Sequence, residues 1–284
     1  MRRPAWARSA RVLVGAGLLL AVLICAAAAP WLALHDPAEQ DLLAVLQPPS
    51  GFAGGSPDYW LGTDSLGRDV WARLVYGART AVLVAVFSAT GAALLGTMLA
   101  HAAGYFGGAV DWVISRAVDV WMSFPPVVLS LILMVGLGGG IDKVVLAIIL
   151  VDWTRFCRVL RSDVVLTARR DYVTAARLAG YSHFQTVLRE VLPASLPLII
   201  TLISLEMGIA VVVEAILSFV GLGVGATLPA WGQMISDARQ NVATSQIGLL
   251  LPMAAIFVTV AGFNLLGDGL RRTLDVRATA GRMA

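Results

Sequence analysis

Long runs of apolar residues dominate the pattern along this chain. Residues 12–34 contain no charged side chain, and residues 80–100 form a second uncharged run. A helix needs about 20 consecutive apolar residues to cross the hydrocarbon core of a bilayer. By this criterion we predict six spans, at residues 12–34, 80–102, 119–138, 143–160, 195–220 and 246–267. The sequence therefore predicts an all-α, polytopic membrane protein with six transmembrane helices.

Two of the predicted runs depart from the simple pattern. The run at 143–160 is the weakest, because Asp152, Arg155 and Arg158 interrupt it. The run at 12–34 is preceded by basic residues and followed by small ones, which is also the pattern of a signal peptide. Its uncharged length and the five later spans favour a retained membrane anchor.

Composition agrees with a chain that contacts lipid. Only 14% of its 284 residues are charged, whereas about 25% is usual for a soluble domain. Cys25 and Cys157 both lie in apolar runs and form no C-x-x-C pair, which favours packed thiols over a disulfide or a zinc site. The three histidines are scattered and predict no metal centre. We also expect no nucleic-acid partner.

The distribution of basic residues predicts the orientation of the chain. Cytoplasmic loops of membrane proteins carry an excess of Lys and Arg. With a cytoplasmic N-terminus, one side of the membrane holds Arg2, Arg3, Arg8, Arg11, Arg116, Arg155, Arg158, Arg161, Arg169, Arg170, Arg177, Arg189, Arg271, Arg272, Arg277 and Arg282. The other side holds only Arg68, Arg73, Arg79, Lys143 and Arg239. We therefore predict that residues 1–11, 161–193 and 271–284 are cytoplasmic, whereas 35–79 and 221–245 are extracytoplasmic.

The segment 161–193 is a polar, arginine-rich island between two apolar runs. Residues 163–179 contain strong helix formers and no Pro or Gly, so we expect one helix there. Gly180 suits the left-handed position that ends a helix. Ser182 and Gln185 form a Ser-x-x-Gln capping box that begins a second, short helix, and we expect Pro193 to end it.

One side of this first helix carries residues that favour close contact. Tyr172, Ala175, Ala176 and Ala179 lie at helical spacing, and the small alanines allow another surface to approach. The arginine-rich composition equally suits an interfacial helix that lies on anionic lipid. The residues alone leave both interpretations open.

Two further features concern the predicted extracytoplasmic side and the fifth span. Val70, Trp71, Leu74 and Val75 alternate with charged residues at helical spacing, which predicts an amphipathic helix that leads into the second span. Glu206 and Glu214 lie inside the fifth span, and an acid there usually faces a cavity or a bundle interior. Both either line a translocation path or form hydrogen bonds between helices.

Five separated stretches, in order, resemble one family of proteins. These are LGTDSLGRDVWARLVYGAR (61–79), GYFGGAVDWVISRAVDVWMSFP (104–125), DYVTAARLAGYSHFQTVLREVLP (171–193), LSFVGLGVGATLPAWGQMISDARQ (217–240) and FNLLGDGLRRTLD (263–275). The sequence is similar to the C-type permease of the dipeptide, oligopeptide and nickel ABC importers of the bacterial inner membrane. The third stretch resembles the EAA loop of these permeases.

The resemblance implies a division of labour among subunits. The EAA loop is a coupling helix that docks on a cytoplasmic ATPase, and the residues that match it are Tyr172, Thr174, Ala175, Ala176, Arg177 and Gly180. Thr174 stands where the family usually has a glutamate, so any salt bridge of that acid is in doubt. The implied partners are a homologous second permease, ATP-binding subunits, an extracytoplasmic solute-binding protein and membrane lipid.

The chain lacks the means to hydrolyse ATP by itself. A P-loop requires a lysine, and the single lysine, Lys143, has no such motif around it. ATP and Mg²⁺ would therefore bind to the partner ATPase. Small peptides are the expected substrate, and nickel or a metal chelate is the alternative. An ion-coupled secondary transporter lacks support because we find no internal repeat, and an intramembrane enzyme would need a set of catalytic residues that the spans do not contain.

Overall fold

The computed structural model describes residues 10–225, 227–242 and 246–280. Within these ranges the chain is helical and contains no strand, which confirms the all-α prediction. The elements are α1 (Ala10–Ala27), α2 (Ala29–Leu32), α3 (Val70–Phe106), α4 (Gly108–Met122), α5 (Pro126–Leu137), α6 (Ile141–Ala168), α7 (Asp171–Leu178), α8 (His183–Thr186), the π-helix η2 (Val187–Val191), α9 (Leu192–Phe219), α10 (Trp231–Ala238), the 3₁₀-helix η3 (Arg239–Asn241) and α11 (Ile247–Ala280). Arg2, Arg3, Arg8 and Arg282 of the predicted cytoplasmic termini lie outside the described residues.

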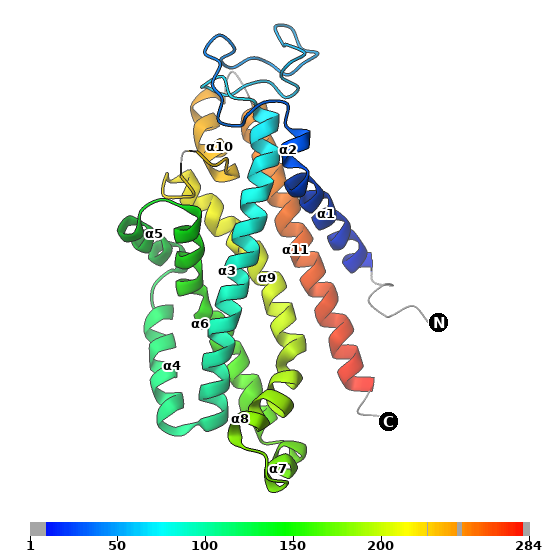
Figure 1. The fold of residues 1–284 in the computed structure, drawn as a ribbon, viewed down its shortest axis with the longest axis vertical. Coiled ribbons are helices and arrows are strands. Elements are labelled where there is room, and N and C mark those ends of the chain that lie inside the picture. Colours follow the sequence, from blue (N-terminus) through cyan, green and yellow to red (C-terminus); the bar gives the residue numbers. More distant parts are fainter. Residues whose placement is uncertain (1–9, 226, 243–245, 281–284) are drawn as a thin grey trace.

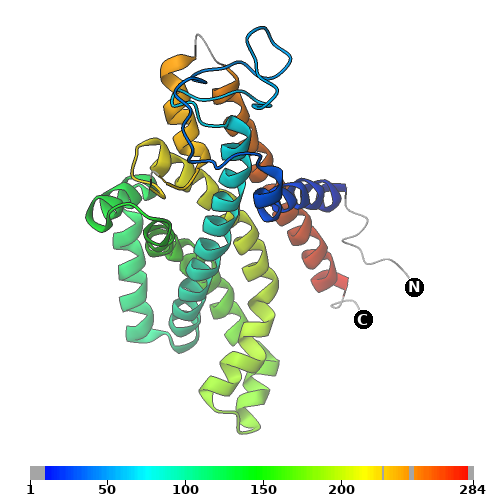
Figure 2. The same ribbon diagram turned by 45° about the horizontal axis from the view of Figure 1, so that its top comes forward.

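The long helices run between two separate ends of the molecule (Figure 1). One end, which we call the loop end, holds residues 33–69 and α10. The other, which we call the α7 end, holds α7 and α8. Helix α3 has 37 residues, or about 55 Å at the usual rise, so that it connects the two ends. Helix α1 runs toward the loop end beside α11, which returns in the opposite direction (Figures 1 and 2).

Four helical stretches among the described residues are long and apolar enough to cross a membrane, namely Ala10–Ala27, Val70–Phe106, His183–Phe219 and Ile247–Arg271. The pair α4 and α5 brings the number to five if it counts as one bent span. Helix α6 is long enough, but Asp152, Arg155 and Arg158 interrupt its apolar sequence. The structure therefore confirms a helical protein with several apolar helices, and the count of six stays a prediction.

Residues 119–138 form two helices instead of the single helix that we expected. Helices α4 and α5 are bent by 88° at the short break between them. A residue that precedes proline avoids the α-helical conformation, and Pro125 itself adopts φ −58 and ψ 126 ahead of Pro126. The indole of Trp121 also donates a 2.5 Å hydrogen bond to the carbonyl of Leu150 on α6. The break therefore has a local cause in the Pro-Pro pair, and a tertiary contact anchors its first half.

The predicted amphipathic helix is part of α3. Asp69 caps α3 by accepting a hydrogen bond from the backbone N–H of Trp71, and no break separates residues 70–79 from the predicted second span. The first turns of α3 face the core instead of a free interface, since both Val70 and Val75 are buried. A helix therefore leads into the predicted second span as expected, but its first turns are packed inside the protein.

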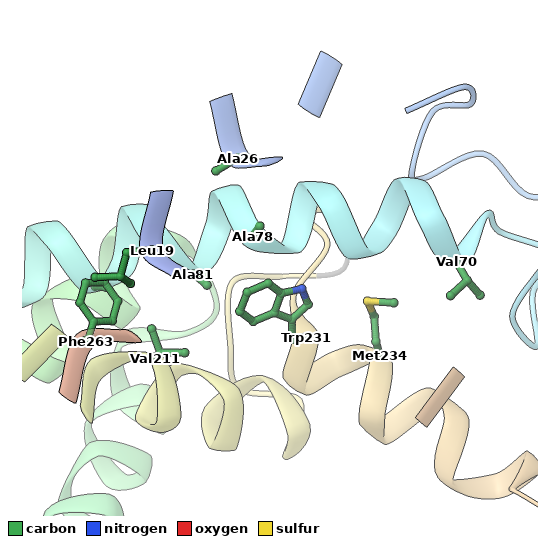
Figure 3. Close-up of a cluster of buried hydrophobic side chains, with 10 residues drawn as sticks. Leu19, Ala26, Val70, Ala78, Ala81, Val211, Trp231, Met234 and Phe263 are labelled. Atoms are coloured by element: carbon green, nitrogen blue, oxygen red, sulfur yellow. The ribbon is translucent and has the colours of Figure 1, made fainter. Parts of the chain in front are cut away.

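A buried cluster near the loop end joins α1, α3, α9, α10 and α11. Figure 3 shows Trp231 of α10 pointing toward Ala78 and Ala81 of α3, while Met234 lies near Val70. The indole N–H of Trp231 donates a 2.9 Å hydrogen bond to the carbonyl of Leu74. Gly77 makes this contact possible, because a Cβ there would lie 2.6 Å from the indole ring. Helix α10 is thus packed against α3 at a fixed position.

Candidate functional site

The helix–glycine–helix unit at the α7 end has the geometry that its sequence predicts. Helix α7 ends at Leu178, and Gly180 then adopts φ +93. Both hydrogen bonds of the predicted capping box are present, from Gln185 N–H to the hydroxyl of Ser182 and from Ser182 N–H to the side chain of Gln185. The prediction of two helices joined at Gly180 is confirmed.

The first helix of this unit is shorter than we predicted. Instead of one helix over residues 163–179, α6 ends at Ala168 and α7 begins at Asp171. The break lets α7 turn so that Val173 packs with Val164 of α6 and Val191 of η2, all three of which are buried. The free energy of burying these valines outweighs the intrinsic helix propensity of the connecting residues.

The second helix does not end at Pro193, which corrects another expectation. Helix α8 continues through η2 into α9 without interruption, and Pro193 lies in the first turn of α9. Proline removes one N–H from a continuous helix and disturbs the turn before it, and here that turn is a π turn. In the π turn before it, the N–H of Leu192 donates to the carbonyl of Val187, five residues back. The α7 end is therefore joined directly to the predicted fifth span.

The residues that we predicted to meet an ATPase form the outward side of this unit. Tyr172, Thr174, Ala175, Arg177 and Gly180 are exposed, and Ala176 is half-buried. The expectation that they mediate contact stays a prediction, since no partner is present in the structure.

Sequence reasoning missed two apolar residues of the same surface. Leu178 is 85% exposed and Phe184 is 72% exposed, on either side of Gly180. We define the coupling tip as the exposed surface of α7 and α8 with the turn between them. The sequence did contain a signal for them, because Leu178 is the last residue of α7 and Phe184 is the second residue of α8. A large apolar residue lies at each helix terminus that flanks the turn.

A polar contact links the coupling tip to the end of α3. The hydroxyl of Tyr105 lies 3.1 Å from Nδ1 of His183, the first residue of α8. The Tyr105 ring also stacks edge-on against the His183 ring and packs against the buried valines beneath α7. Tyr105 therefore links the end of α3 to α8 and to the valine cluster beside it. No periodic pattern in the sequence predicts this contact, because 78 residues separate its partners.

Glu206 and Glu214 are both buried, but their surroundings differ. Glu206 accepts a 3.0 Å hydrogen bond from Arg155 of α6, and it interacts with Asp152 on the same helix as Arg155. Glu214 accepts a 2.6 Å hydrogen bond from Ser218, one turn further along α9. Each acid thus has a partner within this chain. Whether either lines a translocation path stays a prediction.

A cavity of about 320 Å³ lies between α5, α6, α9 and α11. Its polar lining comes from Asp152, Arg155 and Asn264, and most of the remaining wall is apolar. Pro126 and Val127, at the N-terminus of α5, also face it. Arg155 therefore connects the buried Glu206 with an open space in the helical bundle.

The loop end contains a buried ionic network that we did not predict. Arg68 donates one 2.7 Å hydrogen bond to Asp64 and another to Asp237, in the last turn of α10. Arg73 lies 3.6 Å from Asp64 and 3.5 Å from Asp237. Both arginines are buried. The network connects the loop before α3 to α10 across 169 residues of sequence.

Apolar helices of membrane-spanning length, with ion pairs buried among them, define an integral membrane protein. Residues 92–279 match the family model of the binding-protein-dependent transport system inner membrane component. Residues 7–49 match the N-terminal TM domain of oligopeptide transport permease C. The chain belongs to this family of inner membrane components, as a permease subunit of the C type.

Several permeases of transport systems are similar to this chain over most of its length. The dipeptide transport system permease protein DppC of Alkalihalophilus pseudofirmus is 36% identical, over 93% of this chain and 84% of the relative. The glutathione transport system permease protein GsiD of Pectobacterium atrosepticum is 36% identical, over 78% and 74%. The nickel transport system permease protein NikC of Escherichia coli K12 is 35% identical, over 91% of each chain.

Proposed function

We propose that this chain forms half of the translocation pathway of an ATP-driven importer of dipeptides or oligopeptides. Peptide systems are prominent among its relatives, which include the DppC protein of Alkalihalophilus pseudofirmus. The observation that supports the proposal most directly is that two different surfaces lie at opposite ends of the long helices (Figure 1). The coupling tip presents exposed apolar side chains such as Leu178 and Phe184, whereas the loop end lies at the far end of α3 (Figure 1).

Each end suits a different partner. Exposed apolar side chains grouped at the tip of a helical pair are typical of a protein-docking surface, and an ATPase subunit is the partner that the permease family requires there. At the loop end, residues 35–69 and α10 would receive the solute-binding protein. A homologous second permease would supply the other half of the pathway. ATP and Mg²⁺ would bind to the ATPase subunits.

Uptake by reconstituted vesicles tests this function. The chain will be co-expressed with the second permease and the ATPase subunits, and the complex inserted into liposomes. We expect dipeptide uptake only when ATP is supplied on the side of the ATPase and the loaded binding protein on the other. The purified chain alone will hydrolyse no ATP. Uptake driven by an ion gradient, without ATPase subunits, would assign the chain to secondary transport instead.

Topology follows from the same proposal, with the coupling tip and both termini in the cytoplasm of a multi-pass inner membrane protein that has six spans. The excess of basic residues on that side supports this orientation. Single cysteines at Ser182, on the tip, and Ser56, in the loop end, will react with an impermeant maleimide from opposite sides of the membrane. Labelling of both from outside intact cells contradicts the topology.

Nickel or a metal chelate is the second candidate substrate, because a nickel permease is similar to 91% of this chain. The partner binding protein separates the two candidates. A thermal-shift screen of that protein against dipeptides, longer peptides and nickel chelates will identify the ligand that it delivers. Stabilisation by a nickel chelate alone would replace peptides as the proposed substrate.

A further inference from the structure

The cavity between α5, α6, α9 and α11 contains one charged group with a large exposed surface. The side chain of Arg155 is 37% exposed, whereas the side chains of Asp152 and Glu206 are 4% and 2% exposed. A group that enters the cavity therefore meets the guanidinium before it meets either acid. Arginine is the side chain best suited to recognise a carboxylate, because its planar fork can donate two parallel hydrogen bonds.

Asp152 and Glu206 contact the guanidinium of Arg155 on its buried side. Glu206 accepts its 3.0 Å hydrogen bond, and Asp152 lies 3.5 Å from the other terminal nitrogen. The second carboxylate oxygen of Glu206 is buried and has no hydrogen-bond donor among the described residues. A guanidinium that is fixed in this way loses little side-chain entropy when it binds a ligand. The two acids also offset the formal charge of the guanidinium, so that recognition of a carboxylate rests on the exposed N–H groups of Arg155, and a bound anion can leave again.

The N-terminus of α5 adds a second positive element to the same cavity. Pro126 and Val127 line the space, and no side chain caps this end of the helix. Pro126 itself has no N–H, but the N–H groups of the residues that follow it in the first turn of α5 lack partners within the helix and carry a partial positive charge. In other transport proteins, helices that are broken within the membrane direct such termini at anionic substrate groups. Helices α4 and α5 form a break of this kind.

We infer that this cavity is a transient binding site for a carboxylate group, with Arg155 as its anchor and the N-terminus of α5 as its second contact. The amide of Asn264, which also lines the cavity, offers a further hydrogen bond. A peptide presents its terminal carboxylate, and a metal chelate of an organic acid presents a carboxylate too. The inference rests on the proposed function, since the cavity must lie on the path that the substrate takes.

Charged thiol reagents test the site without relying on transport. A single cysteine at Val212, which lines the cavity, will be introduced into the assembled complex after Cys25 and Cys157 are replaced by alanine. Its reaction rates with a sulfonate-bearing and a trimethylammonium-bearing methanethiosulfonate will be compared. We expect the anionic reagent to be favoured by about tenfold, relative to the ratio at a control cysteine at Ser182.

The triple variant Arg155→Gln/Asp152→Asn/Glu206→Gln isolates the role of the guanidinium. It removes the guanidinium together with both acids that face it, so that no buried acid loses only its partner, and we expect it to abolish the preference for the anionic reagent. Arg155→Lys should keep this preference, because its positive charge remains. The inference would be overturned by a preference for the cationic reagent when Arg155 is intact, by an unchanged preference in the triple variant, or by no reaction with either reagent.

Ligand protection identifies the source of the carboxylate. A dipeptide should slow the modification of the cysteine at Val212, whereas the same dipeptide with an amidated C-terminus should not. Nickel citrate and aquo-nickel form the second pair of ligands. Protection by a dipeptide assigns the site to peptides, and protection by nickel citrate alone assigns it to chelates. Equal protection by the dipeptide and its amide contradicts carboxylate recognition, even if ATP-driven uptake supports the proposed function.

Discussion

The two ends of the molecule are held together by different physical means. At the loop end, the buried Arg68 and Arg73 pair with the half-buried Asp64 and Asp237, and Trp231 fits against Gly77. At the α7 end, the coupling tip rests on three valines and on the ring of Tyr105. The loop end is therefore held by a network of charges in addition to apolar packing, whereas the coupling tip is held by a small apolar contact.

This difference indicates which end can move relative to the long helices. Displacing α10 from α3 would separate buried charges, which is expensive. Displacing α7 would expose Val164, Val173 and Val191, a small buried area. The contact of Tyr105 with His183 and the unbroken path from α8 into α9 connect that displacement to α3 and α9. The loop end is built as a rigid platform, and the coupling tip as a unit that transmits movement.

The largest expected effect comes from breaking the network at the loop end. Arg68→Ala leaves Asp64 and Asp237 with only the more distant Arg73, and we expect a loss of about 3 kcal/mol in the free energy of unfolding. Thermal unfolding of the purified chain in detergent will measure it as a lower melting temperature.

Arg79→Ala is the matched control, because Arg79 is an exposed arginine of α3, the helix that follows Arg68. It should change the free energy of unfolding by less than about 0.5 kcal/mol. If Arg68→Ala unfolds at the same temperature as the Arg79 variant, the ionic network does not stabilise the loop end.

A smaller effect on stability, with a larger effect on function, is expected at Gly180. Its φ of +93 disfavours a β-branched residue, and Gly180→Val should cost about 1 kcal/mol. The site has open space around it, so the variant should reach the membrane in normal amounts. It should alter the angle between α7 and α8, weaken ATPase association and abolish transport, while Gly180→Ala should be milder.

Gly51→Val is the control for backbone strain alone. Gly51 has φ +92, open space around it and a position at the loop end. Membrane abundance, ATPase pull-down and peptide uptake will be compared for both variants. Normal uptake by Gly180→Val, or equal loss of ATPase binding in Gly51→Val, would show that the coupling tip does not depend on its glycine turn.

Local signals in the sequence predicted local structure well. The Ser182–Gln185 capping box and the turn at Gly180 depend on neighbouring residues, and both are present as expected. The break before α7 was missed because it depends on packing Val173 against residues of other helices. The unbroken passage through Pro193 was missed because a π turn leaves no plain mark in a single sequence.

For the candidate sites, too, local motifs could be predicted from the sequence, whereas contacts between distant helices could not. The coupling residues were found through a contiguous motif, and the structure places most of them on an exposed surface. The acidic character of Glu206 was visible in the sequence, but its partner Arg155 lies 51 residues away on α6. The network of Arg68 and Asp237 joins even more distant positions. Such pairs become visible only when the fold brings their helices together.

The length of α3 sets the distance between the two working surfaces. Its 37 residues measure about 55 Å, whereas the hydrocarbon core of a bilayer is about 30 Å thick. If α3 stands along the membrane normal, about 25 Å of it is shared between the two headgroup layers and the water beyond them. In that orientation one continuous helix is longer than the hydrocarbon core is thick, so it holds the loop end and the coupling tip beyond the lipid. Soluble partners on either side of the membrane then contact protein before they contact lipid.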